Sequence, residues 1–83
     1  MPRYYFHIHD GMSLPDKEGT ELADLDAAKA EAIKLAAGVL RNGYADVFWN
    51  GTPWRLDVTD SPEPDGSAFV VLNFFATEPN RQP

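Results

Sequence analysis

The residues best suited to chemistry in this sequence are its two histidines, His7 and His9. They lie two residues apart in a segment rich in aromatic and β-favouring side chains, so a strand would place both imidazoles on one face, roughly 7 Å apart. Two neutral imidazoles in this arrangement suit Zn²⁺, with Asp57 or Asp10 as a third ligand. Structural zinc usually takes four protein ligands, and two exposed polar residues are the simpler interpretation. We therefore expect no metal site, and His7, His9 and Asp57 are the candidates for one.

A second chemical feature is a run of acidic residues between positions 10 and 26. Its members are Asp10, Asp16, Glu18, Glu21, Asp24 and Asp26. Their oxygens suit a hard cation such as Ca²⁺, but they lack the alternating spacing of an EF-hand loop. A solvated turn and a helix cap explain the run more simply.

Catalytic motifs are scarce. The chain has no cysteine, which excludes thiol catalysis, disulfides and cysteine-ligated metals. No G-x-S-x-G elbow or phosphate-binding glycine loop occurs, and no motif pairs a serine with a histidine as its base. Acid–base chemistry by Asp57 and a histidine is the one catalytic alternative left open. We expect a protein that is not an enzyme and needs no cofactor.

Composition limits the partners and the compartment. Seven Lys and Arg against 13 Asp and Glu give a net charge of −6, which repels nucleic acid. The first residues lead directly into a strand-like segment without the basic and apolar regions of a secretory signal. No apolar run approaches the ~20 residues that span a bilayer. We expect a cytoplasmic protein that binds neither nucleic acid nor membrane.

The elements that must position these residues follow from periodicity. Residues 4–9, 54–59 and 68–75 predict strands, residues 20–22 a short returning strand, and residues 44–49 a possible hairpin strand ending at Asn50-Gly51. Alanine, leucine and lysine predict a helix over 25–40, capped by Asp24 and ended by Asn42-Gly43. The order predicts an α+β domain in which one helix packs on an antiparallel sheet of three to five strands. We assign this single domain to residues 1–77 and a flexible tail to residues 78–83.

Alternation assigns the side chains of each strand to two faces. Tyr4, Phe6 and Ile8 share one face and the histidines share the other. Likewise, Trp54, Leu56 and Val58 are expected to face the core, while Arg55, Asp57 and Thr59 point outward. The helix is expected to bury the arc Leu25, Ala28, Ala32, Leu35, Ala36, Val39 and Leu40, with Glu31, Lys34 and Arg41 opposite. One helix covers one face of the sheet, so we expect the face that carries the histidines to be open.

Apolar residues outside this core are the main anomaly. Aromatic residues make up 12% of the chain, and five large apolar side chains have no place under the helix: Phe48, Trp49, Phe69, Val71 and Phe75. Either residues 44–53 fold back over them or a second chain covers them. We favour the second explanation, which makes these residues the candidate interface of a homodimer.

Several segments resemble a family of small bacterial proteins classed as a domain of unknown function. They are residues 1–7 (MPRYYFH), Asp10-Gly11, residues 18–22 (EGTEL), Asp24-Leu25, residues 27–32 (AAKAEA) and residues 54–60 (WRLDVTD). The resemblance covers nearly the whole chain and implies a small α+β domain of bacterial origin, without implying any catalytic or binding residue. In element order the chain is also similar to antitoxin domains of the HicB type.

Together these observations predict a non-enzymatic interaction module that self-associates. The alternative is an antitoxin-like acidic protein that binds a small basic partner protein through its negative surface. The first predicts a stable homo-oligomer from the purified chain, and the second predicts a complex with a basic partner.

Overall fold

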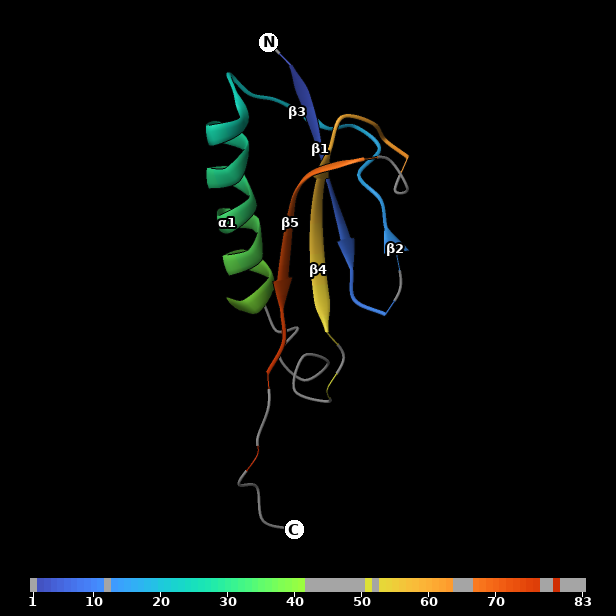
Figure 1. Cartoon of the computed structure of the whole chain (residues 1–83), viewed down its shortest axis with the longest axis vertical. Helices are drawn as coiled ribbons and strands as arrows, with labels where there is room; N and C mark the ends of the chain where they lie inside the picture. Colours follow the sequence, from blue (N-terminus) through green and yellow to red (C-terminus); the bar gives the residue numbers. More distant parts are fainter. Residues whose placement is uncertain are drawn as a thin grey trace.

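The architecture is seen in a computed structural model, which describes residues 2–11, 13–41, 51, 53–63, 67–76 and 79. Its elements in chain order are β1 (Arg3–His9), β2 (Ser13–Leu14), β3 (Thr20–Glu21), α1 (Leu25–Arg41), β4 (Trp54–Thr59) and β5 (Ala68–Phe74). The strands form one five-stranded antiparallel sheet in the order β2-β1-β4-β5, with β3 also paired to β1. Helix α1 lies along one side of this sheet (Figure 1). The predicted α+β class, with one helix on an antiparallel sheet, is confirmed.

Helix α1 begins where its sequence allows a cap. The Oδ1 atom of Asp24 accepts a hydrogen bond from the backbone N–H of Ala27 at 2.9 Å, and the Asp24 carbonyl accepts one from Ala28 at 3.1 Å. Asp26 lies in the first turn and Arg41 in the last, where each opposes the helix dipole. The predicted start and cap of the helix are therefore confirmed.

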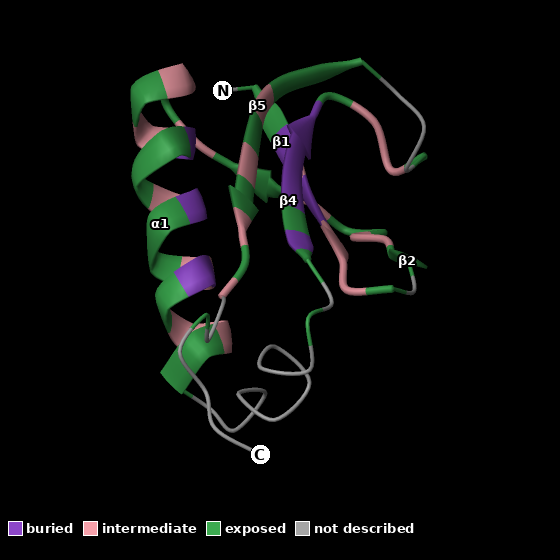
Figure 2. Cartoon of the chain, turned by 60° about the horizontal axis from the view of Figure 1, so that its bottom comes forward, coloured by how far each residue is buried: buried purple, intermediate pink, exposed green. Residues whose placement is uncertain are grey.

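The core lies between α1 and the sheet. Buried helix residues turn toward β4 and β5 (Figure 2). The packed cluster contains Tyr4, Phe6, Ala28, Ala32, Leu56 and Val58. Alanine at the contact positions lets the helix backbone approach the strands closely, so large side chains from the sheet can fill the layer. Leu40, which was expected on the buried arc, is instead 44% exposed, because it lies at the edge of this arc and in the last turn of α1.

The segment between β1 and α1 supplies two short strands. β3 confirms the predicted returning strand and pairs Arg3 with Glu21 and Tyr4 with Thr20. β2 was not predicted, because two residues carry too little alternation to show a strand. It pairs Ile8 with Leu14 after a turn in which Gly11 has a φ of 98°.

Three expectations fall outside the described residues. The possible strand at 44–49, Asn50 of the predicted hairpin turn, and the helix stop at Asn42-Gly43 cannot be compared with the structure. The bounds of the domain and tail, 1–77 and 78–83, likewise remain predictions. Among the described residues, no helix is long and apolar enough to cross a membrane.

Candidate interaction surface and the buried polar face

The sheet face away from α1 carries a row of polar side chains. Cross-strand register places Tyr5 opposite Thr59, His7 opposite Asp57, and His9 opposite Arg55. This face was expected to be open, but His7 and Thr59 are fully buried and Asp57 is only 6% exposed. The expectation that Asp57 and Thr59 point into solvent is therefore wrong.

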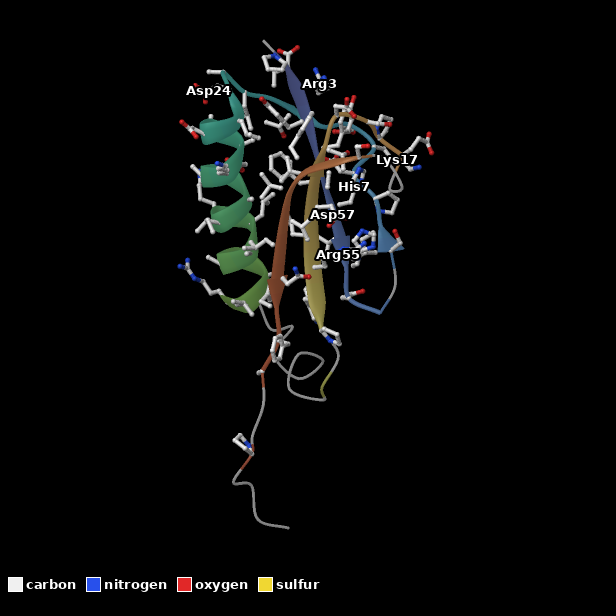
Figure 3. All side chains as sticks on the ribbon, in the orientation of Figure 1. Arg3, His7, Lys17, Asp24, Arg55 and Asp57 are labelled. Carbon is white, nitrogen blue, oxygen red and sulfur yellow. The ribbon has the colours of Figure 1, made fainter. Side chains whose placement is uncertain are left out.

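The cover over this face is the loop between β1 and β3. It lies on the side of the sheet opposite α1 (Figure 1), and in Figure 3 His7 lies close to the part of the loop that carries Lys17. The backbone N–H of Asp16 donates to Nδ1 of His7 at 3.0 Å. The loop is thus tied to the polar face by a hydrogen bond from its backbone, which the hydrophobic pattern of the sequence does not reveal.

The hydrogen bonds of His7 fix its protonation. An N–H group can only donate, so Nδ1, which accepts from Asp16, carries no proton. Nε2 lies 3.0 Å from the Ser61 carbonyl oxygen, which can only accept, so Nε2 carries the proton. It also lies 3.1 Å from the Thr59 hydroxyl oxygen, and that hydroxyl donates to the same Ser61 carbonyl at 2.8 Å. In this arrangement the His7 ring joins the loop after β1 to the turn after β4.

Asp16 completes the outer edge of β1. β2 pairs with the end of β1 and β3 pairs with its beginning, and between them the backbone N–H of Phe6 donates to Oδ2 of Asp16 at 3.1 Å. The other oxygen, Oδ1, accepts from the N–H groups of Glu18 at 3.2 Å and Gly19 at 3.0 Å. One carboxylate oxygen of Asp16 therefore accepts the hydrogen bond that a neighbouring strand's carbonyl would accept. The other oxygen stabilises the turn at residues 16–19.

These contacts also change the acidity of Asp16. Burial by itself would raise the pKa of this carboxyl, but the backbone N–H groups of Gly19, Phe6 and Glu18 stabilise the charged form and outweigh it. The pKa of Asp16 therefore lies below its usual value of 3.8. Asp16 was considered only as one of a run of acids, although its spacing to Gly19, Asp-x-x-Gly, is a signal for the side-chain turn that it makes.

Asp57 is the second buried acid on this face. Its Oδ2 lies 3.2 Å from Nε2 of His9 and its Oδ1 lies 2.9 Å from Nε of Arg55. These are ion pairs by distance rather than aligned hydrogen bonds. Figure 3 shows Arg55 and Asp57 close together on the strand that carries both. The guanidinium of Arg55 compensates a carboxylate that would otherwise be costly to bury, and the His9 ring is its second polar neighbour.

The three candidate metal ligands, His7, His9 and Asp57, contact other groups of the protein. Both ring nitrogens of His7 are engaged in hydrogen bonds, while His9 and Asp57 contact one another. The described residues contain no group of three His, Asp or Glu side chains placed to hold a metal ion. The same part of the chain encloses no pocket.

Two of the candidate interface residues, Phe69 and Val71, lie in β5 at the end of the sheet, and Phe75 directly follows this strand. Phe69 is 50% exposed, Val71 48% and Phe75 69%. β4 pairs with one edge of β5, and no other described strand pairs with its opposite edge. Phe48 and Trp49 lie outside the described residues.

A β-bulge divides these side chains between the two faces of the sheet. Thr59 pairs with Ala68 and Val58 with Val70, which leaves Phe69 as an extra residue. The Phe69 ring therefore meets the core residue Tyr4 edge-on, with ring centroids 5.9 Å apart. Val71, which pairs with Asp57, lies on the opposite face. The expectation that Phe69 has no place on the helix side of the sheet is therefore wrong, and the exposed apolar residues of β5 lie on both faces.

Sequence comparison adds the family. Residues 3–63 match the family described as a domain of unknown function (DUF6894). The chain belongs to the DUF6894 family. The predicted resemblance to a domain of unknown function is thereby confirmed, and the match covers β1, β2, β3, α1 and β4 of this DUF6894 protein but ends before β5. Neither a curated protein nor a solved structure matches the chain.

Proposed function

We propose that this protein is a non-enzymatic interaction module that self-associates through β5. The observation that carries the proposal is the outer edge of that strand, with which no strand of the described residues pairs. Ala68–Phe74 contains no charged residue, no proline and no glycine, and its only polar side chain is Asn73. Edge strands of monomeric proteins usually carry charged residues or proline, because these residues prevent pairing with another chain.

The geometry of β5 favours a symmetric pair. The bulge lies near its beginning, so residues 70–74 remain regular and able to form a ladder. Val71 is the middle residue of the strand, and an antiparallel pair of β5 strands centred on it would place Val70 opposite Leu72 of the second copy. Val70 and Leu72 both pack against the core. The two cores would thus join across the interface, as in a sheet that continues through a two-fold axis.

Exposed apolar side chains on both faces support the same arrangement. Phe69 on the helix side and Val71 on the other side would each lose contact with water when the edges pair, and so would Phe75 directly after the strand. Histidine chemistry is not required for this role, and the contacts of His7 support a structural use of its imidazole.

Light scattering over about 1–100 µM tests the proposal, since micromolar affinity falls in that range. We expect a dimer that dissociates on dilution. Val71→Lys places an ammonium at the centre of the pairing and should weaken association roughly a hundredfold or more. Ile33→Lys is the matched control, because Ile33 is 59% exposed on the far side of α1, and it should leave the dimer intact.

Amide exchange distinguishes edge pairing from contact between faces. In the dimer, backbone N–H groups along the open edge of β5 should gain protection that Val71→Lys removes. A wild type that is monomeric at every concentration, or a dimer that Val71→Lys does not weaken, would overturn the proposal. A monomeric wild type would favour the alternative, an antitoxin-like acidic protein that binds a small basic partner.

A further inference from the structure

A second exposed apolar surface lies on α1, facing away from the sheet. It consists of Ala30, Ile33, Ala37 and Leu40, which we call the outer stripe. Ile33 is 59% exposed and Leu40 44%, and both alanines are exposed as well. In Figure 2 the buried residues of α1 face the sheet and its exposed residues face away, so the stripe is separate from the core.

The spacing of the outer stripe is that of a helix–helix contact. Its residues are three, four and three positions apart, which repeats the a and d positions of a coiled coil. Large side chains at two positions and alanine at the other two would let a second helix approach closely between Ile33 and Leu40. The core of this protein does not need these residues, because α1 meets the sheet through Ala28, Ala32 and Ala36.

The charges beside the stripe identify the partner. Lys29, Lys34 and Arg41 flank it and are exposed, and these are three of the seven basic residues of a chain whose net charge is −6. The acids near it are Asp26, at the beginning of the helix, and Glu31, which lies 3.9 Å from Lys34. The stripe is therefore a basic, apolar surface on an acidic protein.

A second copy of α1 fits this surface poorly. With the stripe residues at a and d of the heptad, Lys29 falls at g and Lys34 at e. In a parallel pair, these positions, five residues apart, would place Lys29 of one helix opposite Lys34 of the other. In an antiparallel pair, lysines would again lie beside lysines. Like charges at these positions oppose pairing between two copies of α1. The basic residues beside the stripe therefore favour a partner helix with acidic residues at the facing positions.

A membrane surface also fits less well. Helices that lie in a bilayer interface bury a wide apolar face rich in Trp, Phe and Leu, whereas the outer stripe has two large side chains and no aromatic residue. We propose that the outer stripe, Ala30, Ile33, Ala37 and Leu40, binds an amphipathic helix of a partner protein that carries Glu or Asp beside its apolar face. This surface is independent of β5.

Two synthetic peptides serve as probes. Both are three-heptad helices with Leu and Ala at a and d, and they differ only in having Glu or Lys at e and g. We expect the Glu peptide to shift backbone amide resonances of residues 29–41 in the full-length ¹⁵N-labelled protein, saturably and less strongly at high salt. The Lys peptide should cause no such shifts.

Variants at exposed positions locate the contact. Ile33→Ser should weaken binding of the Glu peptide roughly tenfold or more through lost apolar burial. Lys34→Glu should weaken it roughly two- to tenfold, whereas the same change at the exposed loop residue Lys17, Lys17→Glu, should not. An unchanged far-UV circular dichroism spectrum and thermal midpoint confirm that each variant is folded.

Three results would overturn the inference. They are no saturable binding of the Glu peptide, equal binding of the two peptides, or equal effects of Lys34→Glu and Lys17→Glu. Binding of the protein to vesicles of phosphatidylserine and phosphatidylcholine, lost in Ile33→Ser, would assign the stripe to a membrane surface instead.

Discussion

The backbone N–H of Asp16 donates to Nδ1 of His7, while the carboxylate of Asp16 accepts from the N–H of Phe6, the residue that precedes His7. The two contacts run in opposite directions between the same loop and the same strand. Each residue therefore holds the other in place, and together they close the loop over the sheet face opposite α1.

Loss of His7 should destabilise the fold. His7→Ala leaves the Asp16 N–H and the Ser61 carbonyl without this partner and opens a cavity, so we expect a loss of about 2–4 kcal/mol in the free energy of unfolding. His7→Phe retains a ring but neither nitrogen and should also destabilise, whereas His7→Gln, with one acceptor and one donor, should recover part of the loss. Chemical denaturation measures all three variants.

The protonation of His7 can be observed directly. Nitrogen NMR of the imidazole should show a protonated Nε2 and an unprotonated Nδ1 at neutral pH. A protonated Nδ1, or His7→Phe as stable as the wild type, would contradict the hydrogen-bonding role of this residue.

Asp16 should make stability depend on pH in the acid range. Its folded pKa lies below its unfolded value, so its charged form stabilises the fold well above pH 3.8, and this contribution disappears as pH falls through the folded pKa. Asp16→Asn should therefore be less stable than the wild type at neutral pH, and the difference should shrink in acid. Asp60→Asn, at an exposed position, is the control and should have little effect. A difference that stays constant from neutral pH to pH well below 3.8 would show that the charge of Asp16 is not responsible.

Gly19 should tolerate no side chain. Its φ is +72°, and a Cβ would come within 2.8 Å of both the Arg3 Cγ and Tyr5 Cε2 atoms and within 3.0 Å of the Tyr4 carbonyl oxygen. Gly51 also has a positive φ, +94°, but a Cβ there would meet nothing within 4 Å. Gly51→Ala should thus lose roughly 1–2 kcal/mol of stability from the backbone alone, and Gly19→Ala about 2–4 kcal/mol from the backbone and the clash.

Thermal and urea unfolding of the two glycine variants would test this difference. Equal losses would mean that the loop moves away from β1 at little cost. That result would also weaken the view that Asp16 and Gly19 hold the loop tightly against the strand.

Local regularities in the sequence were sufficient to predict the main elements. Alternation in β1 and β4 placed Tyr4, Phe6, Leu56 and Val58 in the core, and Asp24 marked the start of α1. These features depend on residues close together in the chain, because a strand repeats every two residues and a cap acts within one turn. The number of helices and the antiparallel class of the sheet followed from the same patterns.

Only the tertiary structure decided which polar residues are buried. Two partners of His7 are the backbone groups of Asp16 and Ser61, nine and 54 residues away, and a backbone N–H or carbonyl leaves no mark in the sequence. The position of Phe69 likewise depends on a bulge that forms when β5 pairs with β4. Burial of a polar side chain is set by whether distant groups satisfy it, so the second face of this sheet could not be read from the residues that lie on it.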